Sequence, residues 1–79
     1  MNTIYSADEF KTLAHRLQVV SAARFLAMSD WRITDEVISS ALALYDFELA
    51  EGWTYDEDTK WTEISADDVA SMFLRKALD

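Results

Sequence analysis

The residues most able to do chemistry in this chain are the acids at positions 56–58, with Glu63 five positions further on. Closely spaced carboxylates are ligands that Ca²⁺ prefers, so a calcium loop is the first chemistry to consider. An EF-hand loop requires a glycine at its sixth position and an acid at its twelfth, and here those positions hold Trp61 and Asp67. Because the glycine is missing, the sequence predicts no metal site and favours a solvated acidic turn.

Catalytic groups of other kinds are sparse. The chain has one glycine, too few for a phosphate-cradling loop, and no cysteine to act as a thiol nucleophile. His15, the only histidine, falls on the polar side of the first expected helix, which favours a solvated structural role over general base catalysis. No second histidine is present to activate a serine. The sequence therefore predicts no catalytic residue, no enzyme activity and no cofactor.

Acidic residues are concentrated in the middle of the chain. The formal net charge is −8, and residues 35–68 carry eleven acids and one base, whereas the segments on either side each carry a net charge of +1. Acids in the first turn of a helix are stabilised by the helix dipole and need no partner. The seven acids of residues 46–63 fall outside such turns: Asp46, Glu48, Glu51, Asp56, Glu57, Asp58 and Glu63.

These seven acids, together with the aromatic residues among them, form the candidate partner-binding site. The aromatic residues are Trp53, Tyr55 and Trp61. An acidic field repels nucleic acid and anionic membranes and attracts basic surfaces, and an exposed tryptophan beside carboxylates is typical of an interface anchor with a charged rim. Solubility is the other explanation of the acids, and core packing is the other explanation of the aromatic residues.

The first of the elements that position this site is a helix expected to begin at Ser6, which forms a capping-box pattern with Glu9. An apolar stripe then recurs at three- and four-residue steps and predicts the buried face of the helix. The stripe is Phe10, Leu13, Leu17 and Val20, opposite Asp8, Lys11, His15 and Gln18. The apolar phase then moves to Phe25 and Met28, which predicts a bend or break near residues 19–21 and a second helical piece.

A further helix is expected from Thr34, which suits the N-cap, to Gly52, which ends it as a glycine at C′ commonly does. Its broad apolar stripe, which includes Tyr45, predicts the most buried helix. The last helix opens with Ser-Ala-Asp-Asp at residues 65–68 and is expected to run to about residue 77.

Residues 53–64 favour an antiparallel β-hairpin. Trp53, Tyr55 and Trp61 are strand-forming residue types, and the acidic run between them favours a turn. If Tyr55 pairs with Trp61, three aromatic side chains share one face. A four-residue loop would pair Tyr55 with Lys60 instead and turn Trp61 to the other face. We favour the first register.

The segment Trp53-Thr54-Tyr55-Asp56, with Thr59 and Lys60 after it, resembles the C-terminal hairpin of the streptococcal protein G immunoglobulin-binding domain. The resemblance is local and implies the hairpin alone, without antibody binding. We therefore expect a mostly helical α+β fold. It has three to four helices, a hairpin at about residues 53–64 before the last helix, and an optional third short strand near residues 3–5.

Size and composition indicate one small acidic domain over residues 1–79. The chain is 51% apolar with ten aromatic residues, which argues against disorder, and it has no cysteine for a disulfide framework. The first ten residues lack the basic and long apolar segments of a signal peptide, and no apolar run is long enough to cross a bilayer. We expect a cytoplasmic protein.

A short, acidic, cysteine-free chain without catalytic groups resembles the small inhibitors that bacteriophages and mobile elements make against host defence, including anti-CRISPR proteins. The run of residues 46–58 carries this resemblance. It implies a non-enzymatic inhibitor in the cytoplasm of a bacterial host. By acidic mimicry it would occupy a basic, nucleic-acid-binding surface of its target, with Trp53 or Trp61 as an apolar anchor. It would bind no nucleic acid or membrane itself. The alternative is a homodimeric regulatory or structural interaction module whose acids only give solubility.

Overall fold

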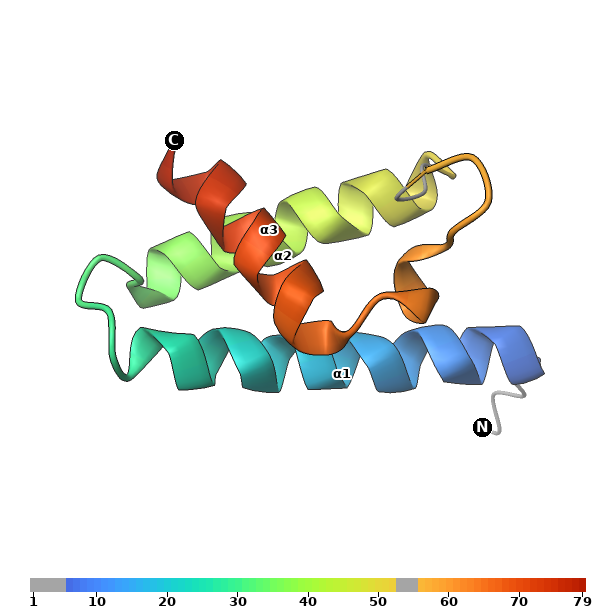
Figure 1. Cartoon of the computed structure of the whole chain (residues 1–79), viewed down its shortest axis with the longest axis horizontal. Helices are drawn as coiled ribbons and strands as arrows, with labels where there is room; N and C mark the ends of the chain where they lie inside the picture. The colour runs from blue at the N-terminus through green and yellow to red at the C-terminus, as the bar shows by residue number, and fades with distance from the viewer. Residues whose placement is uncertain (1–5, 53–55) are drawn as a thin grey trace, which may run out of the picture.

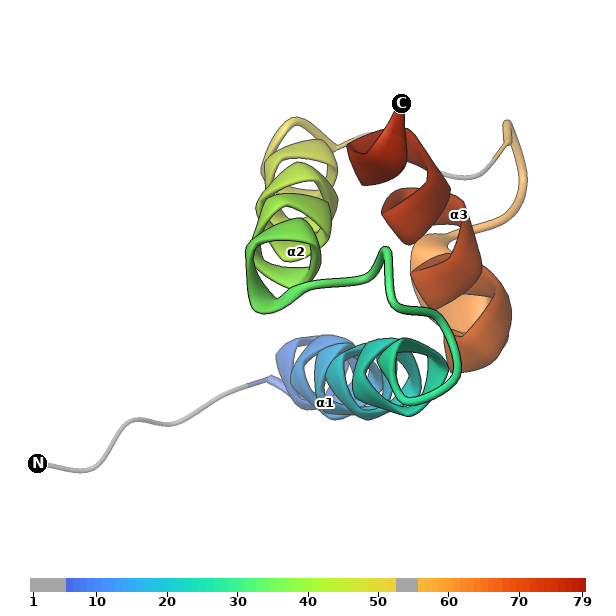
Figure 2. The ribbon, with the colours of Figure 1, turned by 90° about the vertical axis from the view of Figure 1, so that its left-hand side faces the viewer.

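Three α-helices make up the fold in the computed structural model, which describes residues 6–52 and 56–79. Helix α1 spans Ala7–Ala27, α2 spans Asp35–Ala50 and α3 spans Ala66–Leu78, and one 3-10 turn, η1, spans Trp61–Glu63. Helices α1 and α2 run in opposite directions, and α3 crosses both (Figure 1). Seen end-on, α2 and α3 lie above α1 (Figure 2). Helix α3 packs against both α1 and α2, which meet each other along a shorter seam.

Each helix begins where the sequence offers a capping side chain. The Ser6 hydroxyl accepts a hydrogen bond from the Glu9 backbone N–H, and the Glu9 carboxylate accepts one from the Ser6 N–H, both at 3.2 Å. Thr34 and Ser65 each accept from the backbone N–H three residues on, also at 3.2 Å. Helix α2 ends before Gly52, whose φ of 77° suits glycine. The expected helix starts and the stop at Gly52 are confirmed.

The core is organised around α3. Its buried residues are Val69, Ala70, Phe73 and Leu74. Tyr45 of α2 is fully buried, and its ring meets the Phe73 ring edge-on, with 5.4 Å between centroids. On the other side of Phe73, the Trp61 ring lies 5.2 Å away. The helix that packs most extensively against both others is thus α3, whereas the sequence favoured α2 as the most buried helix.

The expected β-hairpin is wrong, and so is the α+β class. No strand is present in residues 6–52 or 56–79; residues 56–58 form a bend, and η1 follows after Thr59 and Lys60. An isolated two-stranded hairpin is marginally stable in water, whereas the three-helix core buries Trp61 to 4% exposure. The favoured hairpin loop also required a left-handed residue, and among the described residues only Gly52 has a positive φ. Trp53, Tyr55 and the optional strand at residues 3–5 lie outside the described residues.

The expected bend near residues 19–21 is also wrong, because α1 continues without interruption through them. The expected orientation of α1 is reversed. Its buried residues are His15, Val19, Ala22 and Ala23. The stripe expected to be buried lies on the surface, where Phe10 is 62% exposed, Leu13 43% and Leu17 67%. The shift in apolar phase therefore reflects a helix with two apolar faces.

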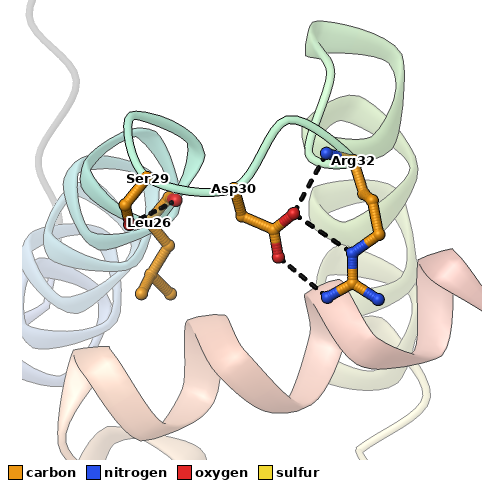
Figure 3. A network of polar contacts seen from close by, with 4 residues as sticks. All are labelled: Leu26, Ser29, Asp30 and Arg32. Atoms are coloured by element: carbon orange, nitrogen blue, oxygen red, sulfur yellow. Dashed lines mark hydrogen bonds and ion pairs between the residues drawn. The ribbon is translucent and has the colours of Figure 1, made fainter.

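The connector between α1 and α2 is held by its own polar contacts (Figure 3). The Asp30 carboxylate accepts hydrogen bonds from the backbone N–H of Arg32 at 3.0 Å and from its guanidinium Nε and Nη2 at 3.1 and 2.8 Å. The Ser29 hydroxyl donates to the Leu26 carbonyl. Hydrogen bonds from Arg32 favour the ionised acid and hold the pKa of Asp30 below its ordinary value. The turn that leads the chain into α2 is thus fixed locally.

None of the helices within residues 6–52 and 56–79 is both long enough and apolar enough to cross a bilayer.

Candidate functional site

The acid-rich segment gathers at one end of the molecule. The end of α2 and the chain leading to η1 both lie there, beside the beginning of α1 (Figure 1). We call residues 51–52 and 56–63 the acidic end. The seven acids of residues 46–63 have different surroundings, and these decide which of them can meet a partner.

Asp46 and Glu48 serve the packing of the helices. The Asp46 carboxylate accepts two hydrogen bonds from the Arg16 guanidinium, each of 2.8 Å, and so ties α2 to α1. These hydrogen bonds raise the pKa of Arg16. Glu48 is only 8% exposed and accepts a hydrogen bond of 3.1 Å from Lys76 of α3. The Lys76 ammonium also lies 4.9 Å from the centre of the Phe73 ring. Both carboxylates therefore face other helices.

Asp56 and Glu63 serve the folding of the loop. One Asp56 oxygen accepts hydrogen bonds from the backbone N–H groups of Asp58 and Thr59, both at 2.9 Å, which is the geometry of an Asx turn. The hydrogen bond from the Asp58 N–H is the largest cause of a lowered pKa for Asp56. The Glu63 carboxylate accepts from the Lys60 backbone N–H at 3.1 Å and so closes the first turn of η1. These two acids hold backbone groups in place.

Glu51, Glu57 and Asp58 have no such task. Their side chains are exposed, and within the described part of the chain their carboxylates accept no hydrogen bond and form no ion pair. We call these three the free acids. Glu51 is the C-cap of α2, a helix with no basic residue in its last turn, so the helix dipole disfavours a negative charge there. Local stability does not explain an acid at this position.

The aromatic residues of the predicted site do not form one exposed group in the described part of the chain. Trp61 lies in the core against Phe73, so it is not placed to anchor a partner. Trp53 and Tyr55 fall outside the described residues. Phe47, which is 54% exposed, lies one helical turn before Glu51 and supplies an apolar surface next to a free acid. The only sequence signal for Phe47 is its position between two acids, Asp46 and Glu48.

His15 is the residue that the sequence placed least well. Its predicted solvated role is wrong, because the ring is buried and both nitrogens have partners. Nε2 lies 2.8 Å from the Ile64 carbonyl oxygen, and Nδ1 lies 3.1 Å from the Tyr45 hydroxyl. A carbonyl only accepts, so Nε2 carries a proton that it donates, and in the neutral ring Nδ1 accepts from Tyr45. Burial raises the pKa of that hydroxyl.

His15 thereby connects α1, α2 and the residue just before the N-cap of α3. A signal for this position exists in the sequence. His15, Val19 and Ala22 recur at four- and three-residue steps, as the members of one helix face do. The stripe of larger side chains on the other face hides this pattern.

Among the residues that the structure describes, no three histidine or acidic side chains are grouped so that they could hold a metal ion. No protein family, curated protein or solved structure matches the chain. The residues of the site are therefore the basis for inferring a function.

Proposed function

We propose that this chain is a non-enzymatic inhibitor that binds a basic, nucleic-acid-binding surface of a target protein through its acidic end. The free acids Glu51, Glu57 and Asp58 are the observation that carries the proposal, since no group within residues 6–52 and 56–79 pairs with their charges. The proposed inhibitor acts by acidic mimicry: its carboxylates take the place of nucleic-acid phosphates on the target. An anti-CRISPR protein of a bacteriophage is the kind of protein that this chemistry fits.

The charge distribution supports a basic partner. The α2 end, the loop and η1 together carry seven acids between residues 46 and 63, against Lys60 as the one base. Arg16 and Lys76 neutralise Asp46 and Glu48, and Asp56 and Glu63 are engaged by backbone N–H groups, so Glu51, Glu57 and Asp58 are the exposed acids of this segment that have no partner within the described residues. Such a field speeds association with a basic surface and weakens as salt is added.

An apolar contact beside the charges supports a protein as the partner. Interfaces combine a desolvated apolar centre with a charged rim, and exposed charges alone contribute little affinity in water. Phe47 lies one turn from Glu51 and presents an aromatic ring at the edge of the acidic end. We therefore assign Phe47 the anchoring role that the sequence suggested for tryptophan.

Capture followed by competition tests this function. The immobilised chain is incubated with bacterial lysate at low salt, and bound proteins are eluted with double-stranded DNA or, separately, with structured RNA. A neutral polymer at equal mass concentration is the control. We expect a nucleic-acid-binding protein to be released by nucleic acid and by high salt, but not by the neutral polymer. The mimicry would be contradicted if the captured proteins do not bind nucleic acid and are not released by it.

A further inference from the structure

Helix α1 carries a second apolar face that is largely exposed in the described part of the chain. Leu13 is 43% exposed, Leu17 is 67% exposed and Val20 is partly exposed, with the exposed Phe10 one turn before Leu13. We call these four residues the outer stripe. They lie largely across the helix from the buried residues Val19 and Ala22, while Leu17 also borders a surface hollow lined by Ser65 and Asp67 at the start of α3.

The spacing of the outer stripe matches a helix-pairing surface. Phe10, Leu13, Leu17 and Val20 alternate steps of three and four residues, the pattern by which two helices interlock along a narrow seam. Ala14 and Ser21 stand beside the stripe, are both exposed, and are small enough for a second helix to approach closely. Helix α1 has 21 residues, which gives a rod of about 32 Å.

Charge along α1 indicates which helix fits this face and in which direction. The first turn carries Asp8 and Glu9, and Arg24 is the basic residue of the last turn. A second α1 running antiparallel brings each Arg24 to the acidic start of the other copy and opposes the two helix dipoles. A parallel arrangement would place like charges together at both ends.

We propose that a second copy of this chain occupies the outer stripe, so that two α1 helices pair antiparallel about a two-fold axis. In the best register Leu13 of each copy lies opposite Leu17 of the other, and Phe10 lies opposite Val20. This gives four apolar layers, and Arg24 then lies opposite Ser6, within reach of Glu9, whereas Asp8 lies on the opposite face of α1. The acidic end is not part of this surface, so the pairing does not rest on the proposed function.

Mass in solution tests the pairing. Light scattering coupled to size exclusion is expected to report a wild-type mass of twice the 9.1 kDa chain. Leu17→Glu introduces two charges into one seam, because a two-fold interface holds each residue twice, and should raise the dimer dissociation constant at least about tenfold. Trp31→Glu is the matched control, since Trp31 is 90% exposed in the connector outside α1, and it should leave the dimer intact. Circular dichroism checks that both variants keep their helices.

A monomeric wild type at millimolar concentration would overturn the proposal, and so would a dimer that Leu17→Glu leaves unchanged. A dimer weakened equally by Trp31→Glu would also overturn it, because the contact would then not be specific to α1.

Disulfide trapping tests the direction of the pairing, and the chain has no cysteine to interfere. A tagged Leu13→Cys chain is mixed with an untagged Leu17→Cys chain under mild oxidation. A bridge requires Cα atoms within about 7 Å, so the antiparallel register predicts more mixed cross-links than either chain forms alone. Efficient cross-linking of each chain with itself would indicate parallel helices, and a lack of mixed product would exclude the register. Either result overturns the proposal.

Discussion

Acids of one short segment divide into two regions of the molecule with opposite tasks. Asp46 and Glu48 face α1 and α3, where Arg16 and Lys76 hold them, and Glu48 is almost buried. Glu51, Glu57 and Asp58 stand at the acidic end with no partner in the described part of the chain. The first region stabilises the fold, and the second adds charge without stabilising it. The binding function that we propose therefore involves the second region only.

Two acids that are adjacent in the sequence can differ in this respect: one stabilises the fold and the other does not. Asp56 accepts two backbone hydrogen bonds that shape the loop, whereas Glu57, the next residue, accepts none. Composition counts both as acids of one cluster. The geometry shows that exchanging Asp56 would change the shape of the loop, while exchanging Glu57 would change only its charge. Substitutions in the two regions should therefore affect different measurements.

The largest effect is expected at Trp61, which the sequence grouped with the binding residues. Trp61→Ala removes a core side chain that packs on Phe73, and we expect it to lower the free energy of unfolding by about 3–5 kcal/mol. Trp31→Ala, at a 90% exposed position, should change it by less than about 0.5 kcal/mol. Urea unfolding followed by circular dichroism measures both. Equal stability of the two variants would place Trp61 at the surface.

The next effect is expected at His15, which joins α1 to α2 and to Ile64, just before the N-cap of α3. His15→Ala leaves the Ile64 carbonyl and the Tyr45 hydroxyl without their partner and should cost about 2–3 kcal/mol of unfolding free energy. Tyr45→Phe removes one of the two hydrogen bonds and keeps the packing, so its cost should be about 1 kcal/mol. The same unfolding experiment compares them. A His15→Ala protein as stable as wild type would show that the connection contributes nothing.

A smaller effect separates two acids of α2 directly. Glu48→Gln weakens a nearly buried ion pair with Lys76 and should lower the unfolding free energy by about 1 kcal/mol. Glu51→Gln removes a charge that the helix dipole disfavours and should leave stability unchanged or raise it by a few tenths of a kcal/mol. Thermal unfolding of the two variants at low salt makes the comparison. If Glu51→Gln were the more destabilising change, Glu51 could not belong to the acids that add charge without stabilising the fold.

The smallest effect concerns the pH response of the loop. Because the pKa of Asp56 is lower in the folded chain than in the unfolded one, its stabilising contribution is complete above the unfolded value. That contribution is lost as the pH falls through the folded pKa. In NMR titrations we expect its carboxyl carbon to titrate below the range of an aspartate in an unfolded peptide. The Asp58 and Thr59 amide signals should move over the same interval. Titration at the unfolded value would show that the turn does not form.

Local signals predicted the ends of the helices, and tertiary contacts decided the rest. Ser6, Thr34, Ser65 and Gly52 act within a few residues of themselves, so their roles could be predicted from the sequence. The hairpin depended on Trp61, whose ring partner Phe73 lies in the following helix, α3. No local rule indicates that a helical core will bury an aromatic residue before a strand can pair with it.

The orientation of α1 shows a second limit. Its stripe of large side chains is more apolar than its face of alanine, valine and histidine, so periodicity favoured the wrong face. Close packing of α3 needs the small residues, and His15 finds hydrogen-bond partners that only the folded chain supplies. For the site, charge patterning singled out the acidic segment of residues 46–63. Only the contacts could separate its seven acids into those with and without partners.

The most direct test compares two variants. Each loses three negative charges, but at opposite ends of the molecule. Glu51→Gln/Glu57→Gln/Asp58→Asn removes the free acids. Asp35→Asn/Glu36→Gln/Asp79→Asn removes exposed acids at the start of α2 and the end of α3 (Figure 1). Their affinities for the captured target are measured at low salt by titration calorimetry. We predict that the first variant binds at least about tenfold more weakly than wild type, while the second binds nearly as wild type. Equal affinities of the two variants would contradict the assignment of binding to the acidic end.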